Sequence, residues 1–279
     1  MSLRYAVGLP NVGEFGDPKV LRELSILAEA SGWDGVYLWD HVLYDEPSWS
    51  VANPTVAAAA IASATSRIRL IIACALARRR VQVVARETAT LDALSDGRLT
   101  LVTPIGAMEL EYSGFGEAAD LRSRATTLDR QLADLVSLWS GKPTSMARGL
   151  EPVQMLPTPV QSPHIPIWIG GRWPNKAPLR RAARFNGAMP TFVNQSSRVV
   201  SVAEVSEVTR YLAAHRIGQT LAGFDLAVEG FTEPETAAEV VSAYRGTGLT
   251  WWIEAMGWWR GGVAAARSRI AAGTPAVPV

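Results

Sequence analysis

The 279-residue chain is poor in cysteine and histidine, with one cysteine, Cys74, and three histidines, His41, His164 and His215. A single cysteine excludes an intrachain disulfide and a cysteine-rich metal centre. His164 lies in a proline-rich segment and His215 ends an expected helix, so the histidines form no ligand cluster. We therefore expect no metal site, and we interpret Cys74 as a buried apolar side chain rather than a nucleophile.

The sequence also lacks long hydrophobic runs and a strong charge of either sign. No apolar stretch approaches the roughly 18 residues of a membrane span, and no signal-peptide pattern opens the chain. We therefore expect a cytoplasmic protein that does not bind a membrane. The formal net charge is +1, with 48% hydrophobic and 19% charged residues. This balance is typical of a soluble enzyme and argues against nucleic-acid binding.

Short apolar runs alternate with longer helix-period segments along the whole chain, which indicates strands followed by helices. The strands are near-continuously hydrophobic, as in a parallel sheet covered by helices. The expected strands are Arg4–Leu9, Gly35–Leu38, Ile68–Ala73, Arg98–Val102, Ile167–Ile169, Gly187–Met189, Asp225–Glu229 and Trp251–Ala255. The expected helices are Asp17–Ser31, Pro54–Thr65, Val81–Leu94, Leu121–Trp139, Asn175–Phe185, Val199–His215, Pro234–Arg245 and Gly261–Ala272. We predict one domain over residues 1–279, an α/β fold of the single (β/α)8 TIM-barrel type.

One segment exceeds the usual connection of about two to six residues in such a fold. Residues 141–166 are rich in proline and glycine and lie between an expected helix and an expected strand. We expect a lid or a small hairpin there.

Two other barrel chemistries can be weighed from the residues. A Schiff-base enzyme needs a lysine at a strand end, but none of Lys19, Lys142 and Lys176 closes an expected strand. Glu229 and Glu254 do end expected strands, and two such carboxylates could serve a glycosidase as acid and nucleophile. The alternative is that each carboxylate pairs with an arginine or caps a helix.

The sequence Trp39-Asp40-His41 ends the second expected strand, at the edge where barrel enzymes place their chemistry. Histidine titrates near neutral pH, so we expect His41 to act as the acid or base with Asp40 beside it. Tyr44 and Trp49 follow in the same loop and suit a planar ring, although surface packing would explain them as well. We expect Tyr44, Trp49 and Glu254 to contact a small-molecule substrate.

Several segments, spread in order over the chain, resemble the luciferase-like monooxygenase superfamily of flavin- and F420-dependent oxidoreductases. They are Gly32–His41, Ala77–Asp92, Ser95–Leu99, Phe115–Glu117, Leu138–Gly141, Pro166–Gly171 and Trp251–Glu254. The resemblance implies a luciferase-like barrel that holds reduced FMN or the reduced deazaflavin F420 at its mouth, with Asp40 and His41 beside the ring. It further implies a non-prolyl cis peptide at Ala73–Cys74 that touches the ring, a separate reductase that supplies reduced cofactor, and a homodimer.

The resemblance places the cofactor phosphate after the fifth strand, where we select Gly170, Gly171, Arg172, Asn175 and Lys176. The two glycines could equally make a turn. Arg78 is a further candidate for the cofactor oxygens, and Arg180, Arg181 and Arg184 would suit either an acidic tail or the protein surface.

One segment departs from the family pattern. Val102-Thr103-Pro104-Ile105-Gly106 replaces a glycine-rich run, which predicts a narrower pocket, and Ala107 replaces an acidic residue of the sugar-phosphate dehydrogenases. We expect an oxidoreductase that oxygenates or reduces a small organic substrate; the alternative is a non-catalytic barrel whose cofactor pocket has closed. Trp258 and Trp259 would either be exposed or cover the mouth.

Overall fold

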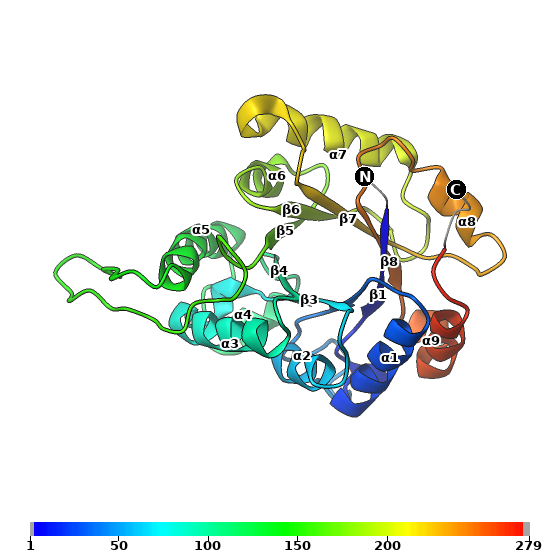
Figure 1. Cartoon of the computed structure of the whole chain (residues 1–279), viewed down its shortest axis with the longest axis horizontal. Helices are drawn as coiled ribbons and strands as arrows, with labels where there is room; N and C mark the ends of the chain where they lie inside the picture. Colours follow the sequence, from blue (N-terminus) through cyan, green and yellow to red (C-terminus); the bar gives the residue numbers. More distant parts are fainter. Residues whose placement is uncertain (1–2, 276–279) are drawn as a thin grey trace.

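The computed structural model describes residues 3–275, in which eight parallel strands close into one barrel in sequence order (Figure 1). The strands are β1 (Arg4–Leu9), β2 (Gly35–Leu38), β3 (Arg69–Ala73), β4 (Leu99–Thr103), β5 (Ile167–Arg172), β6 (Gly187–Thr191), β7 (Asp225–Gly230) and β8 (Trp251–Ala255). Strand β1 pairs with β2 on one side and with β8 on the other, which closes the ring. The predicted (β/α)8 barrel is confirmed.

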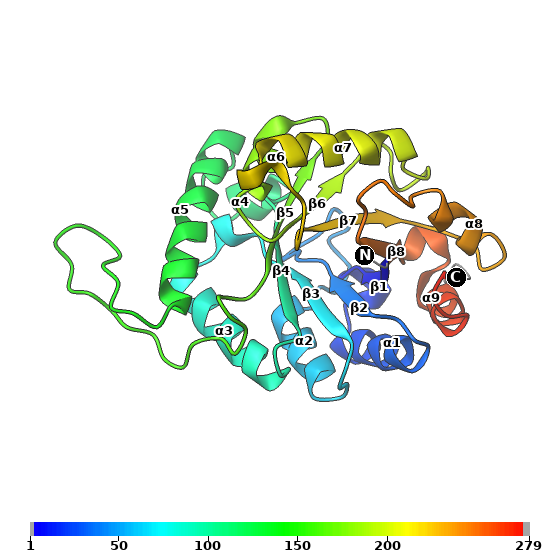
Figure 2. The same ribbon diagram turned by 45° about the horizontal axis from the view of Figure 1, so that its top comes forward.

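Helices surround the barrel (Figure 2). They are α1 (Pro18–Ala30), α2 (Pro54–Ala62), α3 (Val81–Leu94), α4 (Leu110–Ser113), α5 (Leu121–Trp139), α6 (Lys176–Ala182), α7 (Val202–His215), α8 (Ala237–Ser242) and α9 (Gly262–Ala271). Short 3-10 helices are η1 (Gly13–Phe15), η2 (Leu76–Arg78), η3 (Ile217–Gln219) and η4 (Trp258–Arg260). The expected helices are present, α3 and α5 with the predicted bounds and the others shorter than predicted, and α4 was not predicted.

Side-chain caps fix several helix starts. Asp17 and Asn53 accept hydrogen bonds from the first-turn N–H groups of α1 and α2, and each is followed by a proline at the first helical position. Ser201 and Glu204 form a reciprocal capping box on α7. These local signals explain why α1, α2 and α7 could be predicted from the sequence.

Two apolar layers build the core, one inside the barrel and one between strands and helices. The ring centroids of Trp168 and Trp251 lie 5.8 Å apart inside the barrel. A Cβ on Gly187 would lie 2.3 Å from Trp168, so glycine is what makes room for the indole. The barrel centre is therefore packed, and any ligand must bind at its mouth.

The long segment 141–166 leads from α5 to β5 and projects sideways from the barrel (Figures 1 and 2). A helix-to-strand connection lies at the N-terminal end of the strands, opposite the mouth, and Gln161 donates there to the carbonyl of Leu99 over 2.7 Å. Thr144 and Val153 form one antiparallel bridge. The segment therefore has the form of a small hairpin. Its position, opposite the mouth, does not support a lid.

Within residues 3–275, we find no helix with the length and apolar character needed to cross a membrane.

Candidate functional site

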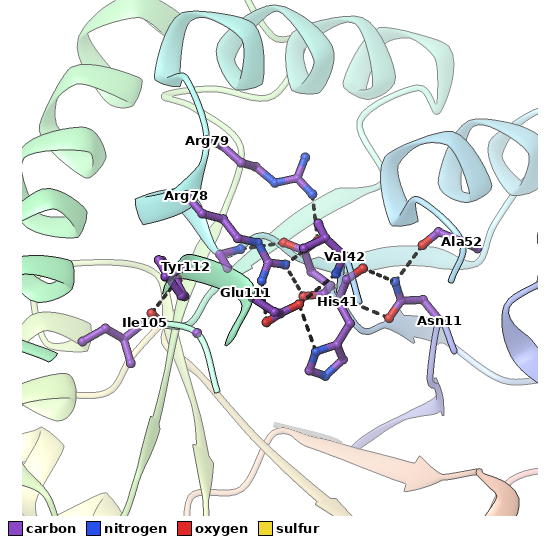
Figure 3. A network of polar contacts seen from close by, with 12 residues as sticks. Asn11, His41, Val42, Ala52, Arg78, Arg79, Ile105, Glu111 and Tyr112 are labelled. Atoms are coloured by element: carbon purple, nitrogen blue, oxygen red, sulfur yellow. Dashed lines mark hydrogen bonds and ion pairs between the residues drawn. The ribbon is translucent and has the colours of Figure 1, made fainter. Parts of the chain in front are cut away.

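A buried polar network fills one side of the barrel mouth, where β2 and β3 end (Figure 3). The Asp40 carboxylate accepts from the N–H of Ala75 over 2.7 Å and contacts Nη2 of Arg79 at 2.7 Å and of Arg78 at 3.1 Å. Arg78 also donates to the Asp40 carbonyl. The side chains of Asp40 and Arg78 are only 1% and 4% exposed. This geometry gives both side chains a structural role, and the catalytic role predicted for Asp40 and the cofactor contact predicted for Arg78 remain predictions.

His41 is held by a carboxylate that the sequence did not reveal. Oε1 of Glu111, on α4, lies 3.3 Å from Nδ1 of His41 and accepts from the N–H of Val42 over 2.8 Å. Oε2 lies 2.6 Å from Nη1 of Arg78. Burial by itself raises the pKa of Glu111, but the hydrogen bonds from His41 and Val42 and the charge of Arg78 lower it overall. Glu111 is therefore an ionised partner that orients the imidazole.

The backbone of His41 is fixed separately by Asn11, which follows β1 and is fully buried. The Asn11 side chain accepts from the N–H of His41 over 3.1 Å and donates to its carbonyl over 2.9 Å. It also donates to the carbonyl of Ala52 over 2.7 Å. One amide thus anchors both ends of the loop that carries Tyr44 and Trp49.

Aromatic side chains cover the mouth beside His41. The rings of Trp39 and Trp259 stack with centroids 5.7 Å apart and planes 16° apart, and Tyr44 stacks on Trp49 at 5.7 Å and 3°. Trp258 meets Trp49 edge-on at 4.8 Å. Trp258 and Trp259 therefore cover the mouth. This is one of the two arrangements considered from the sequence; the other was an exposed position.

A cavity of about 510 Å³ opens among these rings. It is lined by Trp39, Tyr44, Gln195, Ser196, Ser197, Glu229, Gly230, Phe231, Ala255, Trp258 and Trp259. A second cavity of about 660 Å³ adjoins it and shares Ser196, Phe231 and Trp259.

Glu229 is the acidic side chain of the first cavity. It accepts from Nε1 of Trp39 over 3.4 Å and from Nε2 of Gln195 over 3.3 Å. Burial raises the pKa of Glu229 to about 7, and these two hydrogen bonds offset only part of that effect. Glu229 can therefore hold or release a proton near neutral pH.

Glu254 lies on the opposite face of the barrel wall. Its side chain is fully buried and accepts from Trp252, from the backbone and hydroxyl of Thr232, and from Arg260. The substrate contact predicted for Glu254 is wrong, because no surface remains for a ligand. The glycosidase alternative is also wrong, since Glu229 faces the mouth while Glu254 faces the helices.

A family model described as luciferase-like monooxygenase matches residues 5–273. The chain belongs to the luciferase-like monooxygenase family. A monooxygenase from Streptomyces bottropensis is similar at 16% identity over 96% of both chains, with a TM-score of 0.75. An F420-dependent secondary alcohol dehydrogenase, solved with an F420-acetone adduct, matches at 15% identity over 100% of both chains, with a TM-score of 0.77.

A third similar structure comes from Pseudomonas putida, the oxygenating constituent of 3,6-diketocamphane monooxygenase in complex with FMN. It is 13% identical over 100% of both chains, with a TM-score of 0.70. At these identities the structural likeness establishes the fold alone.

One expectation taken from the luciferase-like family is wrong. The cis peptides among the described residues all precede proline, at Pro157, Pro163 and Pro174, so Ala73–Cys74 is trans. Cys74 is buried, and burial is the main cause that raises the pKa of its thiol to about 12. The interpretation of Cys74 as an inert core residue is confirmed.

The luciferase-like phosphate candidates lie at the end of β5, and none of them lines the two cavities described above. A Cβ on Gly170 would lie 3.2 Å from Pro104, and one on Gly171 would lie 2.2 Å from Pro178. Packing therefore accounts for both glycines. Arg172 and Asn175 are exposed, whereas Nζ of Lys176 lies 3.4 Å from the Trp173 ring centroid.

Two arginines, one in α6 and one just after it, face a neighbouring helix. Arg181 and Arg184 both bind the carboxylate of Asp129 on α5, at 2.8 and 2.9 Å. Arg181 and Arg184 thus pair with a helix of the same chain, a use that was not among the alternatives considered from the sequence.

The segment that departs from the luciferase-like pattern is packed shut against α4. Tyr112 donates to the carbonyl of Ile105 over 2.9 Å, and Arg124 donates to that of Gly106 over 3.2 Å. Gly106 has a φ of +92°, and a Cβ there would lie 2.3 Å from the Tyr112 hydroxyl. Open space at this mouth lies instead toward β7 and β8.

Sequence reasoning missed Glu111, Asn11 and Gln195. Glu111 sits on a helix of only four residues, which carries no readable periodicity. Asn11 follows a predicted strand end and could have been selected by the rule that selected Asp40 and His41.

Proposed function

We propose that the protein is an oxidoreductase that uses reduced FMN or reduced F420 to oxygenate or reduce a small organic substrate at the barrel mouth. The observation that carries this proposal is the aromatic cavity of about 510 Å³ that contains Glu229 and adjoins His41 through Trp39 and Tyr44. Ligand pockets are usually concave, aromatic-lined and about 300 to 1,000 Å³ in volume, with few polar groups.

The residues present fit a planar ring with polar edges. Nε1 of Trp259 is buried in the cavity wall and has no hydrogen-bond partner. A buried donor without a partner is unfavourable, and a carbonyl oxygen or nitrogen on a ring edge would satisfy it. The adjoining cavity of about 660 Å³ leaves room for more than the ring.

For the phosphate we retain Arg172, Asn175 and Lys176 and drop the two glycines. Arg172 pairs with Thr191 at the end of β6, and the loop after β6 supplies Gln195 and Ser196 to the cavity. Arg172 thus lies on the strand next to the one whose loop lines the cavity. Its exposed guanidinium suits a phosphate with bidentate geometry.

When bound, the reduced cofactor supplies the hydride or the electrons. The protein's own residues position the reactants, shield them from water and move a proton. The aromatic side chains exclude water, and Glu111 engages Nδ1 of His41 and leaves Nε2 to give or take a proton. Glu229 faces the cavity and would contact the substrate.

The similar structures include both an F420-dependent enzyme and an FMN complex, which supports a cofactor of this class. The similar Pseudomonas putida protein is the oxygenating constituent of its monooxygenase, which supports a separate reductase as partner in the FMN case. We also propose that the protein forms a homodimer.

Calorimetric titration with FMN and, separately, with F420 tests this function. Binding of F420 alone would assign hydride transfer, and preference for FMN would assign oxygenation. Binding of neither would contradict the proposal and favour the non-catalytic barrel.

A further inference from the structure

The carboxylates in and around the barrel mouth differ in whether a cation neutralises them; Asp40, Glu111 and Glu254 are buried, and Glu229 is partly buried. Asp40 contacts Arg78 and Arg79, Glu111 contacts Arg78, and Glu254 contacts Arg260. Glu229 has no ion pair with any residue in the described range 3–275; its contacts are the neutral donors of Trp39 and Gln195.

The wall around Glu229 carries no compensating charge either. The residues that line the 510 Å³ cavity include no lysine, arginine or histidine. They include five aromatic side chains, Trp39, Tyr44, Phe231, Trp258 and Trp259. Aromatic faces are negative, so this wall attracts cations and offers an anion little.

An aromatic box with one carboxylate is the chemistry that recognises an organic ammonium group. We propose that the mouth cavity binds a substrate bearing a small alkylammonium group, with the cation against Glu229 and beside the aromatic side chains that line the cavity. This inference rests on the proposed function and names its substrate class. The bound cation would take the place that an arginine takes beside the other buried carboxylates.

The proposal predicts a dependence on pH. The groups that face Glu229 are Tyr37 of β2, Trp39 directly after β2, Gln195 after β6 and the backbone of Gly8 on β1. Burial and the nearby carboxylates raise the pKa of Tyr37. It therefore stays neutral, and Glu229 is the group that titrates near neutrality. Cation binding should be strong at pH 8.5 and weak at pH 5.5.

The test compares choline with 3,3-dimethylbutan-1-ol, which has the same shape without the charge. Both are titrated by calorimetry into the purified protein, before and after saturation with whichever cofactor binds. At pH 8.5 we expect choline to bind at least about tenfold more tightly, the ratio expected of a desolvated cation between aromatic faces.

Two variants locate the effect. Glu229→Gln keeps the shape of the side chain and should abolish the preference for choline. Glu235→Gln removes an equal charge from an exposed position outside the cavity and should leave the preference intact.

Equal binding of choline and its neutral analogue, both before and after saturation with cofactor, would overturn the inference. A preference for choline that survives Glu229→Gln would also overturn it. Failure of the cofactor titrations would instead count against the proposed function. The two failures are distinguishable because the ammonium site is measured without turnover.

Discussion

The Oε1 atom of Glu111 lies 3.3 Å from Nδ1 of His41, although 70 residues separate them in the chain. The contact joins the end of β2 to a short helix after β4, and Arg78 from the segment after β3 completes it. Three successive β/α units therefore share one buried network, and the orientation of His41 depends on all of them.

Replacing His41 with alanine should lower turnover by about 10² to 10⁴, the usual contribution of a positioned acid or base. Cofactor affinity should change by no more than about threefold, because His41 is proposed to carry a proton rather than to hold the ring. Steady-state kinetics and calorimetric titration check the two halves. Unchanged turnover would remove His41 from the mechanism.

Replacing Glu111 with glutamine should destabilise the fold by about 3 kcal/mol, because Arg78 loses a buried counter-charge. The pKa of Glu111 is lowered in the folded state, so its contribution is present above the ordinary value of 4.5 and lost as pH falls through the lowered one. The variant should therefore lose less stability than the wild type on acidification. Urea unfolding at pH 7 and below 4 measures both effects.

Glu109→Gln is the matched control, since Glu109 is exposed and directly precedes α4. It should unfold like the wild type at both pH values. Equal unfolding free energies for Glu111→Gln and Glu109→Gln would show that the buried network adds nothing to stability.

Glu229 should make the protein less stable as pH rises. Its pKa is raised from 4.5 to about 7, so the folded state holds the proton more tightly and stability is lost as pH rises through this window. The difference corresponds to about 3 kcal/mol between pH 4 and 8. Glu229→Gln should remove that slope in urea unfolding; an identical slope in both proteins would place the titration elsewhere.

Replacing Arg172 with alanine should weaken cofactor binding about tenfold or more, the loss expected when a charged hydrogen bond to phosphate disappears. Arg180→Ala removes the same charge from another exposed position, on α6, and should bind cofactor normally. Calorimetry on both variants decides the matter. Equal affinities would require the phosphate to lie elsewhere, with the 660 Å³ cavity as the next place to look.

The fold was predictable because each strand is a short apolar run and because α1, α2, α5 and α7 begin with a side-chain cap, signals that act locally. The sequence did not predict which face of the barrel wall each strand side chain occupies. Parallel strands are apolar on both faces, so the sequence lacks the alternation that would tell inward from outward. Glu229 and Glu254 both end strands, yet only Glu229 faces the mouth.

Partners distant in sequence were the other limit. Asp40 and His41 were found by their place at a strand end, but the arginines and Glu111 that determine their roles come from other β/α units. Arg78 was selected as a cofactor contact because it follows the third strand. Only the folded structure shows that its side chain is 4% exposed.

The stacked indoles of Trp39 and Trp259 also have an optical consequence. Their ring centroids are 5.7 Å apart with planes 16° apart, and the two residues come from the second and the last β/α units. Such a pair gives coupled bands in near-ultraviolet circular dichroism only while the first and last parts of the barrel meet. The near-ultraviolet circular dichroism spectrum therefore reports whether the barrel is closed, and no ligand is needed to measure it.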